Sequence, residues 1–182
     1  SEMCIRDSAN LQRYAEAFSF LQSKNLYTVD DLESTLHAMQ NKIDTLKKSA
    51  SVKQARIKEV DGLLRMVDYY KSGKPAADKL KSIRFEKSRR KYKAEHDEEL
   101  RTFYMAERKL KPYFKDGKLP ITAWHKEREQ LEQEYRNIQT ELSPFHADAK
   151  KLWAIHYNIY EVQHEQERQN TTTRQKKQEI EH

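Results

Sequence analysis

Residues 32–67 read LESTLHAMQNKIDTLKKSASVKQARIKEVDGLLRMV. Alternating steps of four and three residues through this stretch select eleven positions, which we call the first seam: Leu32, Leu36, Met39, Ile43, Leu46, Ala50, Lys53, Ile57, Val60, Leu64 and Val67. Nine of the eleven are sizeable apolar residues, and this spacing places them along one side of an α-helix. A long helix with one apolar stripe needs a partner against which to bury it. The stretch therefore predicts a long helix packed against another helix.

The same spacing returns in the second half of the chain. Its positions, the second seam, are Trp124, Arg128, Leu131, Tyr135, Ile138, Leu142, Phe145, Ala149, Leu152, His156 and Ile159. Two such seams in one chain indicate helices that lie side by side, and short connections between them favour antiparallel packing. The alternative is a helical hairpin that pairs with a second copy through its seams.

The expected fold class is all-α, with long antiparallel, coiled-coil-like helices in an elongated arrangement. We expect a short N-terminal helix over residues 11–21 and three long helices, over about 29–70, 77–113 and 120–162. Thr28 or Asp30 should cap the first long helix. Turns are expected at residues 72–75 and 116–118, where glycine recurs with proline or aspartate. Pro144 should bend the last helix without ending it.

Composition agrees with narrow seams and little further core. The chain has 182 residues, of which 36% are hydrophobic and 35% charged, and its mean hydropathy is −1.09. We expect one helical region over residues 9–162 and a frayed or disordered tail over residues 163–182. The only aliphatic residue of this tail is Ile180. Residues 1–8, SEMCIRDS, resemble translated sequencing-adapter sequence; the alternative is a disordered N-terminus.

Location is indicated by what the sequence lacks. It has no run of 18 apolar residues that would span a membrane, and no leader pattern. Its single cysteine, Cys4, cannot form an internal disulfide, which is typical of a reducing compartment. The sequence therefore favours a cytoplasmic protein without membrane contact.

The strongest charge feature is the stretch KLKSIRFEKSRRKYK at residues 79–93, where eight basic residues and one acidic residue give +7, against +6 for the whole chain. A dense cationic stripe of this kind suits the phosphates of nucleic acid, which lysine and arginine bind without regard to base sequence. The candidate DNA-contacting residues are Lys79, Lys81, Arg84, Lys87, Arg89, Arg90, Lys91 and Lys93. The alternative is a solvated helix face that pairs with the acidic residues at positions 95–99.

Motifs for catalysis are missing from the sequence. Its seven histidines form neither an i,i+4 pair nor an HExxH arrangement, and no glycine-rich phosphate loop or nucleophile elbow is present. We therefore expect no catalytic residue, no metal ligand and no cofactor in this chain.

Five segments, in order, resemble the C-terminal helical region of bacterial relaxases, the nucleases that mobilise plasmids and conjugative transposons. Residues 11–21, LQRYAEAFSFL, resemble the short helix of that family. Residues 25–32, NLYTVDDL, resemble its G-I-x-S-Y-x-E-L motif, with Asn25 where glycine is usual. Residues 85–100, FEKSRRKYKAEHDEEL, resemble its basic K-x-x-R-x-x-F/Y-x-x-x-H-x-x-E-L stretch, and residues 106–111 and 118–124 follow in the family's order.

The resemblance implies a bacterial protein whose chemistry belongs to a separate N-terminal nuclease domain. No residue of this chain matches that domain, so no catalytic role is transferred. The implied role is to support DNA binding and assembly of the relaxosome, in contact with DNA and with proteins of the transfer machinery. A coiled-coil module that binds other proteins, without a nucleic-acid role, is the alternative from another functional class.

Overall fold

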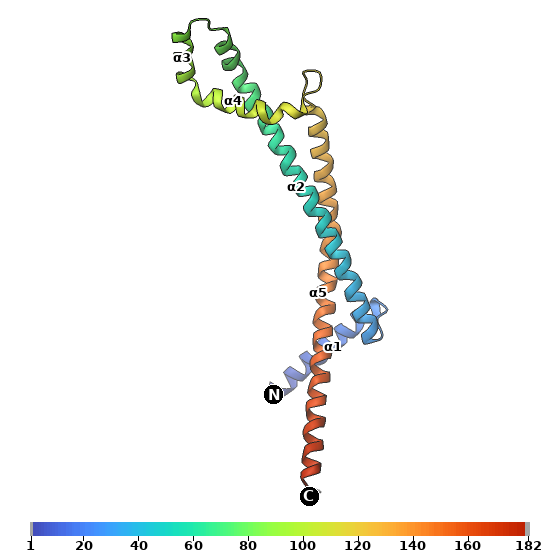
Figure 1. Cartoon of the computed structure of the whole chain (residues 1–182). Helices are drawn as coiled ribbons and strands as arrows, with labels where there is room; N and C mark the ends of the chain where they lie inside the picture. The colour runs from blue at the N-terminus through green and yellow to red at the C-terminus, as the bar shows by residue number, and fades with distance from the viewer. Residues whose placement is uncertain (1, 181–182) are drawn as a thin grey trace. The chain divides into compact units, whose positions relative to one another are not determined.

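The computed structural model describes the backbone of residues 2–180 and the side chains of residues 12–173. Its elements are helices, with no β-strand in the described part: α1 (Glu2–Ser23), α2 (Val29–Ser82), α3 (Glu86–Glu95), α4 (Asp97–Leu110), the 3₁₀ turn η1 (Lys111–Tyr113) and α5 (Ile121–Ile180) (Figure 1). The fold class is therefore all-α, as predicted. The chain forms two compact units: a central unit, residues 48–139, and a terminal unit that joins the residues up to 47 with those from 140 onward.

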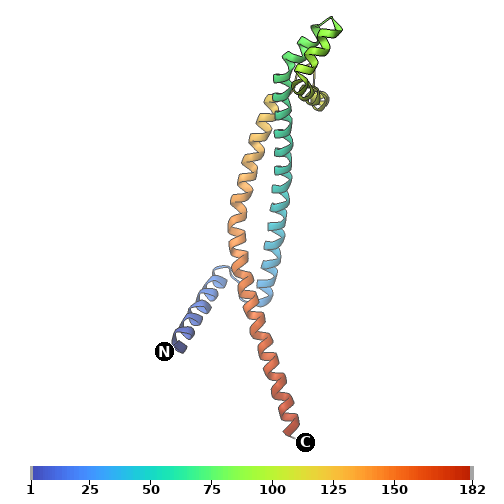
Figure 2. The same cartoon turned by 90° about the vertical axis from the view of Figure 1, so that its left-hand side faces the viewer.

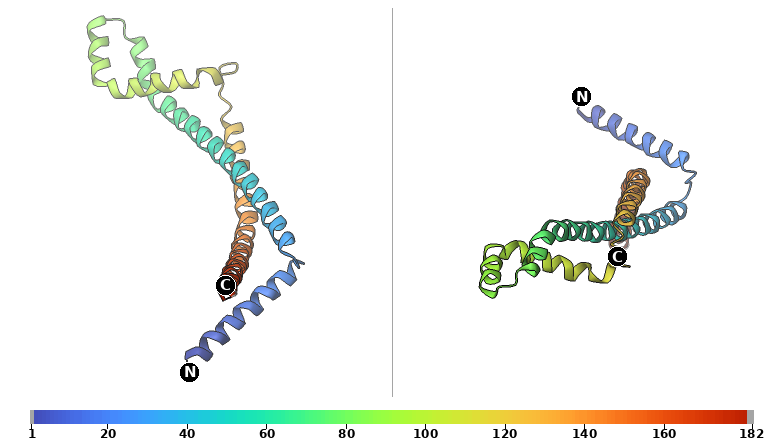
Figure 3. Two further views of the ribbon diagram at one scale, coloured as in Figure 1. Left: turned by 60° about the horizontal axis from the view of Figure 1, so that its bottom comes forward. Right: turned by 90° about the horizontal axis from the view of Figure 1, so that it is seen from above.

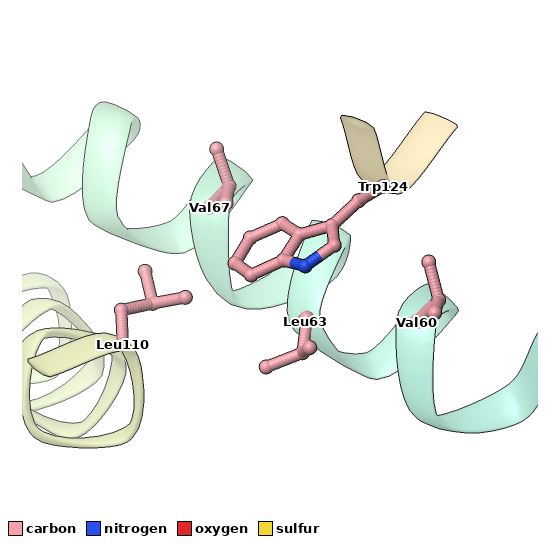
Figure 4. Close-up of a cluster of buried hydrophobic side chains, with 5 residues drawn as sticks. All are labelled: Val60, Leu63, Val67, Leu110 and Trp124. Carbon is pink, nitrogen blue, oxygen red and sulfur yellow. The ribbon is translucent and has the colours of Figure 1, made fainter. Parts of the chain in front are cut away.

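In the central unit, α2 and α5 lie side by side, and Trp124 fills the space at the start of α5. The indole is 4% exposed and packs into a cluster with Val60, Leu63, Val67 and Leu110. Figure 4 shows the ring lying over successive turns of α2. Burying an aromatic ring of this size is among the larger single contributions to a helical core. This cluster therefore anchors the beginning of α5 on α2.

Three ion pairs flank the packed seams of the central unit. Arg56 donates two hydrogen bonds to Glu127, at 2.7 and 3.2 Å, and these raise the pKa of the guanidinium above its usual value. Further along, Lys53 pairs with Glu134 and Arg128 pairs with Asp61. Lys53 of α2 meets Glu134 of α5, and the later Asp61 meets the earlier Arg128, so the two helices are antiparallel within this unit.

The terminal unit repeats this arrangement with its own cluster. Leu26, Leu32, Leu36 and Leu152 are buried together. Lys42 pairs with Glu141 at 2.9 Å, and the ring of His156 lies 3.0 Å from Glu33. These contacts also run antiparallel along α2 and α5.

The predicted start of α2 is confirmed. The Thr28 hydroxyl accepts a hydrogen bond from the backbone N–H of Asp31 at 3.1 Å, as an N-cap residue does. Just before it, Asn25 has φ of +55°, in the left-handed region that glycine and asparagine tolerate best. This residue lets the chain turn between α1 and α2.

The two predicted seams are confirmed in full. All eleven positions of the first seam and all eleven of the second are buried or partly buried. Leu36 and Leu152 are 2% and 0% exposed. Because each seam is covered by helices of the same chain within each unit, a second copy is not needed to bury it.

The predicted turn at residues 72–75 is wrong, since α2 continues through Pro75 to Ser82. The cost of a proline inside a helix is roughly 3 kcal/mol. Next to Pro75, a second apolar cluster of the central unit offsets that cost. Its buried members are Ala76, Ala77, Leu80, Leu100 and Phe103.

The predicted long helix over residues 77–113 is also wrong. The chain breaks at residues 83–85 and again at His96, where φ is −118° and ψ is 26°, so α3 and α4 are separate short helices. Two long helices, and not three, therefore build the fold. Figure 3 shows the end of α2, α3 and α4 following one another around an open frame.

The turn at residues 116–118 is confirmed, with positive φ at Asp116 and Gly117 and a bridge between Lys115 and Lys118. Helix α5 continues through Pro144, as predicted, but its expected end near Val162 is wrong because the helix reaches Ile180. Every side chain from Tyr160 to Thr173 is exposed, so this extension buries no stripe. Residues 2–8 are helical and belong to α1.

Candidate nucleic-acid interface

The eight candidate DNA-contacting residues lie close together in the central unit. Lys79 and Lys81 occupy the last turn of α2, Arg84 lies in the connection, and the other five lie on α3. All eight side chains are exposed. We call this set, Lys79, Lys81, Arg84, Lys87, Arg89, Arg90, Lys91 and Lys93, the basic surface.

Helix α3 presents its cations to solvent because it has almost nothing to bury. None of its residues is buried, and Tyr92 is its main packing group. The Tyr92 ring lies 4.1 Å from the His96 ring, centroid to centroid, and Lys79 Nζ lies 5.2 Å from the Tyr92 centroid. These contacts hold one side of α3 near the end of α2 and leave its remaining circumference free.

Few of these cations are neutralised by neighbours. Arg90 pairs with Glu86 at 3.0 Å, and Lys91 approaches Glu95 at 3.9 Å. The other six, Lys79, Lys81, Arg84, Lys87, Arg89 and Lys93, have no carboxylate within 4.0 Å among the described residues. The solvated-face alternative needs such pairing, but only two of the eight cations are paired, and only Lys91 pairs with a residue of positions 95–99.

The acidic residues at positions 97–99 lie on α4 and not on α3. Asp97, Glu98 and Glu99 form the first turn of α4, where negative charge is stabilised by the positive end of the helix dipole. Glu99 lies 3.5 Å from the His96 ring. The break at His96 thus separates a cationic helix from an acidic helix start.

Phe85 stands in the middle of the basic surface. Its side chain is 78% exposed, more than any other large hydrophobic side chain described as exposed, and its backbone is extended (φ −83°, ψ 122°). It precedes the first turn of α3 and makes no side-chain cap. An aromatic ring amid cations gives this surface an apolar contact point as well as charge.

A second group of cations was not predicted as a site. Arg108, Lys109, Lys111, Lys115 and Lys118 are exposed at the end of α4, in η1 and in the turn that follows. A surface groove of about 670 Å³ lies beside them, lined by Tyr70, Tyr104, Glu107, Arg108, Lys111 and Phe114. Five basic residues against Asp116 within eleven positions was the sequence signal for this group.

The described residues include no group of three or more histidine, cysteine, aspartate or glutamate side chains placed to hold a metal ion. Between residues 2 and 180, no helix has the length and apolar character needed to cross a membrane. Comparison of the chain with protein-family models, with curated proteins and with solved structures gives no significant match.

Proposed function

We propose that this chain is a non-catalytic C-terminal part of a relaxase, and that its basic surface holds DNA through the backbone phosphates during conjugative mobilisation. The observation that carries the proposal is the concentration of eight exposed cations on α3 and the residues just before it, six of them without an acidic partner among the described residues. Partner proteins of the relaxosome would meet the exposed outer sides of the long helices.

Two features of the terminal unit support the resemblance on which the proposal draws. The family's motif usually has glycine where this chain has Asn25, and Asn25 adopts the left-handed backbone that explains such a glycine. The segment that follows caps α2 through Thr28. Asn25 and Thr28 therefore adopt the left-handed backbone and the N-cap geometry that the glycine and serine of the motif suggest.

The physical consequence is a steep dependence of affinity on salt. Each phosphate neutralised on duplex DNA adds about −0.9 to the slope of log K against log salt concentration. Five of the eight cations make neither an ion pair nor a ring contact with a described residue. If each of the five contacts one phosphate, the slope is about −4.5. Base sequence should matter little, because phosphate contacts carry no sequence information.

The test is fluorescence anisotropy with labelled duplex DNA over a series of salt concentrations. We expect the variant Lys87→Gln, Arg89→Gln and Lys93→Gln to bind more weakly, with a slope shallower by about 2.7. The matched control replaces three exposed lysines elsewhere, Lys47→Gln, Lys48→Gln and Lys58→Gln, which changes net charge equally. Equal losses in both variants would mean that only overall charge matters, and no loss in the first would reject the basic surface.

The alternative function is a coiled-coil module that binds other proteins. Exposed aromatic side chains of the terminal unit, such as Tyr14, Phe18 and Tyr157, favour some protein contact. A chain that binds no DNA at low salt but associates with a protein would support this alternative.

A further inference from the structure

The terminal unit has an open apolar groove between α1 and α5. Its volume is about 610 Å³. The apolar lining comes from both helices, namely Tyr14, Ala17, Phe18 and Leu21 of α1 and Ile155, Ile159 and Val162 of α5. In Figure 2 the two helices diverge from the point where α1 ends.

One end of this groove is closed by the core and the other end is open. Leu21, Ile155 and Ile159 pack against the buried cluster that contains Leu152. Further out, Tyr14 and Phe18 are 64% and 63% exposed. The two helices thus pack together at one end of the groove and leave the aromatic rings at the other end mostly exposed. Exposed aromatic rings lack the free energy that burial would supply.

The charges at the groove are balanced. Arg13 and Glu161 are the charged residues in its lining. Neither makes an ion pair with a described residue. Nucleic acid or an acidic protein would favour a rim of cations only. One positive and one negative charge instead suit a surface that binds a copy of itself, because in a two-fold interface each of the two residues contacts the other one in the second copy.

We propose that a second copy of this chain occupies the groove, with a two-fold axis along the groove's length. This axis places α1 of one copy opposite α5 of the other, so that the four helices surround a shared apolar core. Arg13 of each copy then faces Glu161 of the other, and the two ion pairs are related by symmetry. Tyr14 and Phe18 become buried anchors of the interface.

This contact is separate from the features used above. Apart from Ile159, the last position of the second seam, the groove lining lies outside the seams, and the basic surface belongs to the other unit. The inference therefore does not depend on DNA binding, and either can fail while the other holds.

Sedimentation velocity of the full chain at increasing concentration tests the proposal. We expect a reversible dimer, weakened roughly tenfold by Arg13→Glu and likewise by Glu161→Arg, since each substitution acts twice in a two-fold dimer. An equimolar mixture of these two variants should dimerise again, because both cross-pairs in the mixed dimer then join opposite charges. A pairing between Arg13 and Glu161 of the same chain predicts no recovery on mixing and would overturn the proposal.

The apolar anchor is tested with matched phenylalanine variants. Phe18→Ala should weaken the dimer by about 100-fold or more, because an aromatic anchor is lost from both copies. Phe85→Ala removes a ring that is also exposed but lies outside the groove, and it should leave the dimer unchanged. Circular dichroism checks that both variants stay helical. A chain that is monomeric at all concentrations, or equal effects of Phe18→Ala and Phe85→Ala, would refute the second copy as the occupant.

Discussion

A close approach between two helices near the basic surface occurs at Gly73, where α2 crosses α4. A Cβ atom added to Gly73 would lie 2.6 Å from the Cβ of Phe103 and 3.2 Å from the backbone oxygen of Glu99. Phe103 is 2% exposed, and its ring stacks on Tyr70 with centroids 5.1 Å apart. The neighbour that would have to move is therefore held in place, and Gly73→Ala should overpack this crossing.

The size of the effect follows from two opposing contributions. Ordinary van der Waals contact begins near 3.4 Å, so α4 must withdraw by about 0.8 Å or more. Overpacking of a buried contact costs roughly 1–3 kcal/mol. Replacing glycine by alanine inside a helix recovers about 1 kcal/mol. We expect Gly73→Ala to be destabilised by about 1 kcal/mol.

Gly62 in the same helix provides the matched control. A Cβ atom at Gly62 meets nothing within 4 Å, so Gly62→Ala should gain the helix-propensity term alone, about 1 kcal/mol. Urea unfolding followed by circular dichroism at 222 nm measures both variants. The free energy of unfolding should fall for Gly73→Ala and rise for Gly62→Ala, with a difference of about 1–3 kcal/mol between them.

The reasoning fails if both substitutions stabilise the protein to a similar degree. That result would mean that α4 is free to move away from α2 without loss. It would also mean that the packing of α4 on α2 does not fix the position of α3 and its cations.

Two further predictions concern the central and terminal units. The hydrogen bond from Lys53 lowers the pKa of Glu134, so the stability that this carboxylate contributes is full above the ordinary glutamate range and is lost as the pH falls through the lowered pKa. In urea unfolding at pH 7 and pH 3, Glu134→Gln should therefore reduce the loss of stability on acidification. The control Glu129→Gln, which replaces an exposed glutamate, should not. Trp124 is 4% exposed and Trp153 is 49% exposed. Trp153→Phe leaves only the buried Trp124, so its fluorescence should be blue-shifted and resist quenching by iodide, whereas Trp124→Phe leaves only Trp153 and should be readily quenched. Equal quenching would contradict the packing of α5 on α2.

Local patterns predicted those features of the fold that arise within a few helical turns. The seams could be read from the spacing of Leu32 to Val67 because side chains three and four residues apart share one face of a helix. The Thr28 cap follows from a side-chain oxygen that satisfies a free N–H one turn later. The basic surface was visible as charge density, since exposed cations depend little on tertiary contacts.

Only the tertiary structure decided where the long helices end. Gly73 and Pro75 predict a turn locally, yet Ala77, Leu80 and Phe103 bury each other there, and burial between segments far apart in sequence outweighs the local penalty. Conversely, the chain breaks at His96 without glycine or proline. That break lets α4 bury its apolar stripe while α3, which has none to bury, stays in solvent with its charges exposed.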